Sequence, residues 1–174
     1  RKSAPVSWSD TSIGFIKDYI LMRENIAAAM KQALKGKDQA ALGTIRLIMA
    51  ALKDRDIAAR GNGKPDGISD DDILGLLQTM IKQRTESAKM YNDGGRPELA
   101  AAEEAEIAII KGFLPAQLSD DEMKSAIAAA IEQISAASVK DMGQVMGFLK
   151  SNYAGQMDFS AASQAVKTAL MGKG

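Results

Sequence analysis

The feature that most constrains the fold of this chain is residues 82–115, where two helical patterns flank a short turn. Asp93 is followed there by two glycines, which reach positive φ without steric cost and so favour a turn. Pro97 suits the first turn of the next helix, because a backbone N–H at that position has no intrahelical partner. The stretch therefore predicts a helical hairpin with a short connection.

Both arms of this predicted hairpin carry charged residues on their apolar stripes. The first stripe contains Ile73, Leu77, Met80, Arg84, Ala88 and Tyr91, and the second contains Leu99, Glu103, Glu106, Ile107, Ile110 and Leu114. Arg84 precedes Gly94 by ten residues, and the two glutamates follow it by nine and twelve. In an antiparallel hairpin these positions face each other, so we expect a charge-assisted cluster of Arg84, Glu103 and Glu106.

Two interpretations of this cluster are open. It is either a buried lock that fixes the register of two helices, or a polar site with a function of its own. We favour the lock, because structural ion pairs perturb local charge without taking part in chemistry. On that interpretation Arg84→Ala costs on the order of 3–5 kcal/mol, because the substitution leaves buried carboxylates without a partner.

Composition predicts an all-α fold and excludes several kinds of chemistry. The 174 residues are rich in alanine and methionine and poor in aromatics, and no stretch alternates apolar and polar residues. Cysteine and histidine are absent, which excludes thiol nucleophiles, disulfides, Cys/His zinc sites and imidazole catalysis. We expect no metal and no cofactor. The absence of cysteine leaves the redox compartment unreadable, so we take the cytoplasm as the default location. No apolar run is long enough to cross a membrane, so we expect no membrane partner.

The organisation along the chain is predicted as a larger helical hairpin or bundle subdomain over residues 22–115, followed by a three-helix subdomain over residues 116–174. We treat residues 1–21 as an upstream translated segment, a cloning remnant or an extra helix, with Met22 as the natural start. Capping patterns mark several helix starts: Asp38, Ser69 with Asp72, Ser119 with Glu122, and Ser138 with Asp141. Three aspartates at 70–72 complement the positive end of a helix dipole, which explains them without a metal.

Formal net charge is zero, so nucleic-acid binding would require a local basic patch. Arg46, Lys53 and Arg60 recur at seven-residue steps on one side of the predicted second helix. Such a row is usually a solvated helix face, and the alternative is a stripe that contacts phosphates. The glycine-rich loop that follows lacks the preceding strand and the Walker spacing, so we reject a nucleotide-binding loop.

An ordered set of landmarks from residue 22 onward resembles the GatB/YqeY family. The set comprises Lys82-Gln83-Arg84 with Glu86-Ser87, Tyr91, Gly95-Arg96 with Leu99, Glu103 and Glu106, Leu114-Pro115 with Gln117-Leu118, Met142-Gly143 with Val145-Met146, Gly155 and Asp158. The resemblance implies a helical subdomain followed by a three-helix one. It also implies kinship with the tail of the B subunit of tRNA-dependent amidotransferases, which contacts tRNA while the chemistry takes place elsewhere.

Three functional hypotheses follow. The first is a tRNA-binding module, with the candidate contacts Lys82, Lys89, Arg96, Arg46, Lys53 and Arg60. The second is a carbon–nitrogen ligase with glutamine as amido donor, for which the residues offer no support: Ser87 and Lys89 point to different helix faces, and the two glutamates lack Glu-x-x-His partners. The third is a docking module for an aminoacyl-tRNA synthetase or another translation partner.

Overall fold

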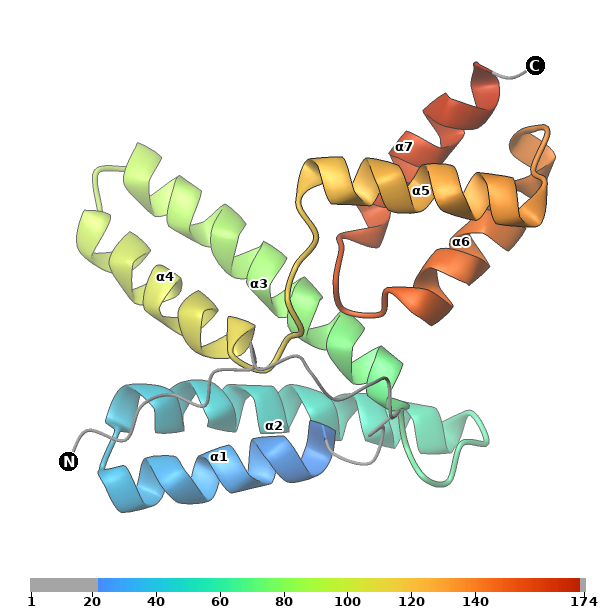
Figure 1. Cartoon of the computed structure of the whole chain (residues 1–174). Coiled ribbons are helices and arrows are strands. Elements are labelled where there is room, and N and C mark those ends of the chain that lie inside the picture. The colour runs from blue at the N-terminus through green and yellow to red at the C-terminus, as the bar shows by residue number, and fades with distance from the viewer. Residues whose placement is uncertain (1–21, 173–174) are drawn as a thin grey trace, which may run out of the picture. The chain divides into compact units, whose positions relative to one another are not determined.

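A computed structural model describes residues 22–172, and this part of the chain is all-α with no strand, which confirms the predicted fold class. The predictions about residues 1–21 lie outside the described residues. The helices, labelled in Figure 1, are α1 (Met22–Gly36), α2 (Gln39–Gly61), α3 (Asp70–Asp93), α4 (Pro97–Lys111), α5 (Asp120–Ile134), the 3₁₀ turn η1 (Val139–Asp141), α6 (Met142–Asn152) and α7 (Phe159–Met171). The chain divides between Pro115 and Ala116 into two compact units, one containing α1–α4 and the other α5–α7.

Capping side chains set the helix starts where the sequence predicts them. Asp38 accepts a hydrogen bond from the backbone N–H of Ala41 and begins α2. Ser69 and Asp72 form a reciprocal capping box at the start of α3, with both backbone N–H groups satisfied. These polar side chains pair N–H groups that have no acceptor inside the helix, so each helix start is fixed locally by its own sequence.

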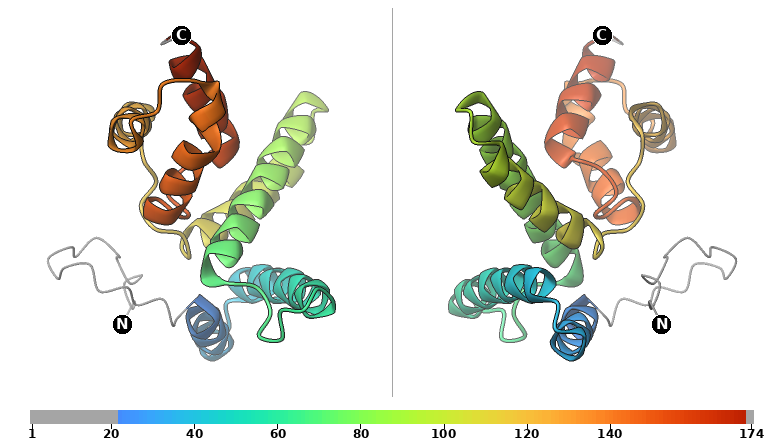
Figure 2. Two further views of the ribbon diagram at one scale, coloured as in Figure 1. Left: turned by 90° about the vertical axis from the view of Figure 1, so that its right-hand side faces the viewer. Right: turned by 90° about the vertical axis from the view of Figure 1, so that its left-hand side faces the viewer.

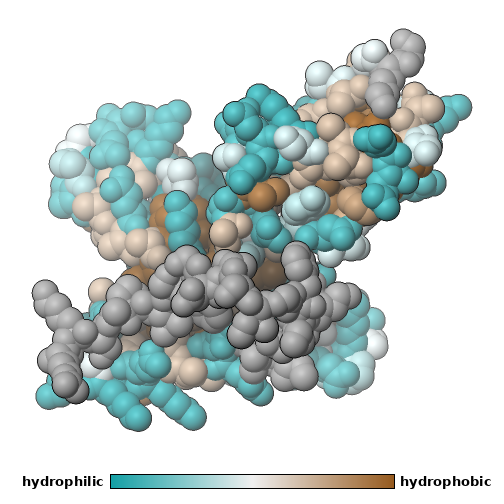
Figure 3. Space-filling view, in the orientation of Figure 1, coloured by the Kyte–Doolittle hydropathy of each residue, from teal (hydrophilic) through white to brown (hydrophobic). Residues whose placement is uncertain are grey.

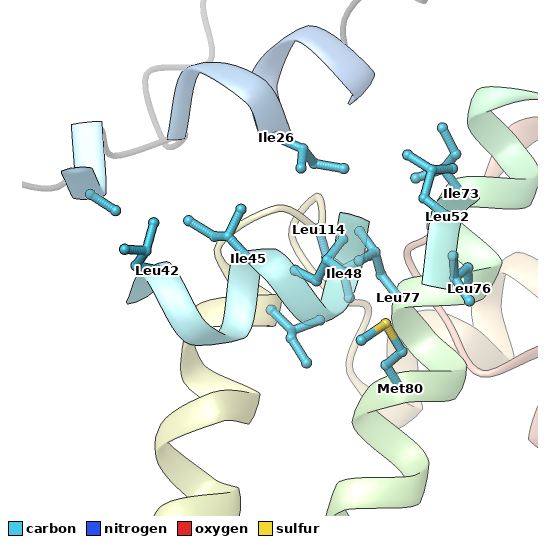
Figure 4. Packing of buried hydrophobic residues seen from close by; sticks show 12 residues of the cluster. Ile26, Leu42, Ile45, Ile48, Leu52, Ile73, Leu76, Leu77, Met80 and Leu114 are labelled. Atoms are coloured by element: carbon cyan, nitrogen blue, oxygen red, sulfur yellow. The ribbon is translucent and has the colours of Figure 1, made fainter. Parts of the chain in front are cut away.

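The core of the larger unit lies where α1 and α2 meet the N-terminal half of α3 and the C-terminal half of α4. Apolar side chains from all four segments converge there in the close-up view (Figure 4). The fully buried members are Ile26 on α1, Ile48 on α2, Ile73 and Leu77 on α3, and Ile110 on α4. Burying each of these side chains contributes roughly 1.5–3 kcal/mol, so this cluster anchors the hairpin to α2.

The α3–α4 hairpin extends beyond this core as a pair of helices that pack on each other. Figures 1 and 2 show it rising from the α1–α2 layer, with its tip away from α2. Ala88 and Ala100 are buried in the upper seam, and their small side chains let the two helices approach closely. Hydrophilic residues dominate the surface around the tip (Figure 3). The hairpin therefore has an apolar base and a largely polar outer end.

The smaller unit has its own core and its own helix caps. Ser119 and Glu122 form the capping box that begins α5, and Ser135 ends it in the left-handed conformation with φ 55°. Residues from α5, α6 and α7 make a continuous apolar cluster that includes Val145, Leu149 and Val166. Each unit thus buries its own apolar surface.

Candidate functional site

The seam of the α3–α4 hairpin contains the ion pair that the charged stripes point to. The Arg84 Nε donates to Glu106 Oε2 at 2.7 Å, and Arg84 Nη1 donates to the Met80 carbonyl one turn earlier at 3.3 Å. The Arg84 side chain is 15% exposed and that of Glu106 is 35% exposed. The guanidinium is therefore held inside the seam, while its carboxylate partner is open to water on one side.

Glu103 lies half-buried in the same seam but is not joined to this pair. Among residues 22–172, the ion pairs of the hairpin are Arg84 with Glu106 and Arg96 with Glu98. The structure thus brings together two of the three residues expected in the cluster. The position of the pair just above the core matches a register lock, and that role remains a prediction.

A second polar cluster, which the sequence reasoning missed, joins the start of α1 to the end of α2. Arg23 donates to both oxygens of Asp56, from Nη1 to Oδ2 at 2.6 Å and from Nη2 to Oδ1 at 2.8 Å. Arg23 Nη2 also donates to the Ile68 carbonyl at 2.8 Å, and the Ile68 N–H donates to Asp56 Oδ1 at 2.9 Å. We call Arg23, Asp56 and Ile68 the latch, because they fasten the loop after α2 onto α1.

Glycine is required beside the latch. Gly67 has φ +85°, and a Cβ built on it would stand 2.2 Å from Asp56 Oδ1. The paired guanidinium, helped by the Ile68 N–H and by the charges of Arg23 and Arg60, outweighs burial and lowers the pKa of Asp56 from 3.8 to about 2. The carboxylate is therefore ionised and fully engaged at neutral pH.

One sequence signal could have revealed the latch. The buried stripe of α2 runs through Leu42, Ile45, Ile48 and Leu52, and Asp56 follows Leu52 by four residues. An acid on an apolar stripe is the same signal that singles out Arg84. It is obscured here because Asp56 lies in the charged run 53–56, and its partner Arg23 is 33 residues away.

The six candidate RNA contacts fall into two groups on different elements. Lys82 and Lys89 are exposed on α3, with Glu86 between them at helical spacing, and Arg96 at the hairpin tip is paired with Glu98 at 2.6 Å. Hydrogen bonding to Arg96 lowers the pKa of Glu98, so this carboxylate stays charged beside the guanidinium. The cations of the hairpin are therefore accompanied by carboxylates.

The other group, on α2, forms a row on an exposed face. Arg46, Lys53 and Arg60 are all exposed, and seven-residue steps keep them on nearly one side of the helix, about 10 Å apart along its axis. Two large apolar side chains are exposed on the same side: Met49 is 39% exposed and Ile57 is 56% exposed. We call these five residues the α2 face.

Acidic side chains do not neutralise the α2 face from within its own helix. The sequence of α2 contains two acids, Asp54 and Asp56. Asp56 is held by Arg23 in the latch, and Asp54 projects about a quarter turn away from the cation row. Among the described residues, no ion pair involves Arg46, Lys53 or Arg60, although Arg60 Nε donates to the Pro65 carbonyl at 3.2 Å.

Within residues 22–172, no three His, Cys, Asp or Glu side chains gather in a way that could hold a metal ion. The three aspartates at 70–72 stand in the first turn of α3, where Asp72 completes the capping box. The same described part of the chain has no helix that is both long and apolar enough to cross a membrane.

Comparison with known sequences now identifies the family. The family described as "Yqey-like protein" matches residues 23–170, which include all of α2 to α6 and all but one terminal residue of both α1 and α7. This chain belongs to the YqeY-like family. The resemblance that the hairpin landmarks suggest is thereby confirmed at the level of the family.

The chain is similar to fungal proteins named "Altered inheritance of mitochondria protein 41, mitochondrial". It is 27% identical to the one from Pyrenophora tritici-repentis over 134 residues, 75% of this chain and 70% of that protein. It is 30% identical to the Lachancea thermotolerans protein over 98 residues, 56% of this chain and 50% of that protein. It is 32% identical to the Vanderwaltozyma polyspora protein over 85 residues, 49% of this chain and 44% of that protein. The matches thus span half or less of the latter two relatives.

These names contradict the predicted cytoplasmic location, because the relatives are all called mitochondrial. The prediction used the cytoplasm as a default, and neither the amino-acid composition nor the helical pattern carries information about the compartment.

Proposed function

We propose that this chain is a non-catalytic docking module that serves an enzyme of aminoacyl-tRNA formation, and that the α2 face is where the partner binds. The observation that carries the proposal is the composition of this face: three exposed cations that form no ion pair within residues 22–172, and two exposed apolar side chains. Charge steers and orients an acidic partner, whereas buried apolar contacts hold it.

The class of partner comes from the family. The resemblance of the hairpin landmarks to the GatB/YqeY family implies kinship with the tail of the B subunit of tRNA-dependent amidotransferases, and on that expectation an amidotransferase or an aminoacyl-tRNA synthetase is the protein to test. Because the relatives are named as mitochondrial proteins, the partner enzyme is to be sought in the mitochondrion.

The experiment measures binding of the purified chain to a purified amidotransferase and to a set of synthetases by a label-free method at several salt concentrations. The double variant Arg46→Glu, Lys53→Glu should lose binding. The matched control Lys82→Glu, Lys89→Glu changes the net charge equally on α3 and should retain it. Equal loss in both variants, or no loss in the α2 variant, would overturn the proposal. Ammonia release from glutamine by the purified chain would support the ligase alternative instead.

A second candidate function, binding of tRNA itself, is favoured by the cation row alone. Three cations about 10 Å apart could each neutralise a phosphate. Binding through them should then fall with salt with a log–log slope of about −2 to −3. A slope of this size for tRNA, abolished by the α2 variant and unchanged in the α3 control, would select this candidate over protein docking.

A further inference from the structure

We infer that the α2 face receives an acidic amphipathic helix, in which acids recur every seven residues and apolar residues lie between them. This inference rests on the proposed function and specifies the chemistry of the partner. It starts from the pitch of the cation row, because an α-helix lying along α2 presents its own residues on the same scale.

The pitch of the row matches a helix because both are set by the same backbone geometry. Arg46, Lys53 and Arg60 rise about 10 Å at each step along α2. Acids at positions i, i+7 and i+14 of a partner helix repeat at the same rise, so three ion pairs form in register along two nearly parallel or antiparallel axes. Charges at one heptad position are the usual means by which paired helices fix partner choice and orientation.

The apolar members of the face complete the pattern. Met49 follows Arg46 by three residues, and Ile57 follows Lys53 by four, so each stands between two cations along the helix. Apolar residues at three- and four-residue steps between charged ones are the pattern by which one helix packs on another. Methionine adds an adaptable side chain that conforms to the partner surface.

The same apolar residues favour protein over RNA as the occupant. Contacts to phosphates need cations and hydrogen-bond donors. Met49 and Ile57 would therefore have no role in binding an RNA backbone. Unpaired bases are held most strongly by stacking on aromatic side chains, and α2 contains none, so only the guanidinium groups of Arg46 and Arg60 offer a stacking surface on this face. An acidic helix uses all five residues of the face, whereas RNA uses three.

The test uses two labelled 21-residue peptides of identical composition and net charge. The matched peptide carries Glu at three positions seven apart, with Leu three or four residues after the first two, and the scrambled peptide breaks this spacing. Helicity of both is measured by circular dichroism, and binding to the full chain by fluorescence anisotropy. The matched peptide should bind about tenfold more tightly than the scrambled one, since only its charges and apolar side chains meet the face in register.

Charge reversal tests whether binding depends on one specific contact, that between Lys53 and the central acid of the peptide. Lys53→Glu should weaken the matched peptide about tenfold, and a peptide with Lys at the central acidic position should bind this variant better than it binds wild type. Lys82→Glu is the control of equal charge change and should leave both affinities unchanged. Circular dichroism of each variant shows that loss of binding does not come from loss of fold.

Equal binding of the matched and scrambled peptides, or no rescue by the reversed charge, would overturn the inference. So would tRNA binding that depends on Lys53 while the matched peptide fails to bind. If an amidotransferase or synthetase binds through the α2 face but the matched peptide does not compete, the inference fails and the proposed function stands. If the peptide pattern holds but none of those enzymes binds, the inference stands and the proposed function fails.

Discussion

Replacing Asp56 with asparagine should destabilise the larger unit by an amount that depends on pH. Asparagine keeps the size of the side chain and an oxygen that can accept from the Ile68 N–H, but it removes the charge that faces Arg23. The substitution therefore isolates the contribution of the ion pair from that of the backbone hydrogen bond.

The magnitude follows from the lowered pKa. The pKa of Asp56 falls from 3.8 to about 2, and each unit corresponds to about 1.4 kcal/mol of differential stabilisation. The carboxylate side is well buried, at 11% exposure, but the Arg23 side chain is 38% exposed and water screens it. We therefore expect Asp56→Asn to lower the free energy of unfolding by about 2 kcal/mol at neutral pH.

The pH dependence has a definite sign. Because the folded-state pKa is depressed, the stabilisation is complete above the ordinary value of 3.8 and is lost as the pH falls through about 2. The pKa values of Glu98, Glu122 and Asp141 are also lowered. These groups are common to wild type and variant, so their contributions cancel when the two stabilities are subtracted. The difference should be constant above pH 5 and shrink between pH 4 and pH 2.

Urea unfolding followed by circular dichroism at a series of pH values measures this difference. Hydrogen exchange of peptides from α1 and α2 assigns it to the larger unit. The control is Asp54→Asn, which removes an exposed charge two residues away and should change stability by less than about 0.5 kcal/mol. A difference between wild type and Asp56→Asn that stays constant down to pH 2 would refute the reasoning, because it would show that the charge of Asp56 is not what stabilises the latch.

Three further changes are predicted, each to be measured by chemical denaturation. Gly67→Ala should cost at least about 2 kcal/mol, because its Cβ would meet a carboxylate oxygen at 2.2 Å, whereas Gly95→Ala, at a similar positive φ with open space around it, should cost about 1 kcal/mol. Arg84→Ala should cost about 2 kcal/mol, below the 3–5 expected from sequence, since its partner is 35% exposed and can be rehydrated; Glu103→Gln should change little. Ser135→Gly should stabilise the smaller unit by about 0.5 kcal/mol by relieving φ 55°, and no gain would argue against strain there.

The features that sequence reasoning found are those with a local or periodic cause. Ser69 and Ser119 begin helices through side chains that reach only three residues ahead, so the short pattern is sufficient. Arg84 and Glu106 meet because a short turn fixes which residues of the hairpin are opposite. In both cases the partners lie within the reach of helical geometry and one connection.

The features that were missed depend on how distant segments meet. Arg23 and Asp56 are joined only after α1 folds back on α2, and no repeat or spacing marks them as partners. Glu103 shares the stripe of Glu106, yet a stripe does not tell which of two acids receives the guanidinium. Spacing also groups Arg46, Lys53 and Arg60, but only the structure shows that exposed apolar residues stand between them.

The latch and the α2 face are coupled through one carboxylate. Asp56 lies one helical turn before Arg60, whose charge already helps to lower the Asp56 pKa. Arg23 holds both carboxylate oxygens and directs them toward the loop. Arg60 therefore donates to the Pro65 carbonyl and forms no ion pair with Asp56, which leaves its charge for the proposed partner. Arg23→Ala should free the carboxylate to pair with Arg60, and should weaken partner binding severalfold as well as stability.

A comparison of two variants separates these effects. Arg23→Lys keeps a positive charge near Asp56 but loses the bidentate hydrogen bonding. It should therefore lower the free energy of unfolding while retaining more partner binding than Arg23→Ala. Binding is measured without urea, at a temperature at which circular dichroism shows that both variants are folded. If the two variants bind equally, Asp56 does not compete for the cations of α2, and the latch serves only to fasten the loop.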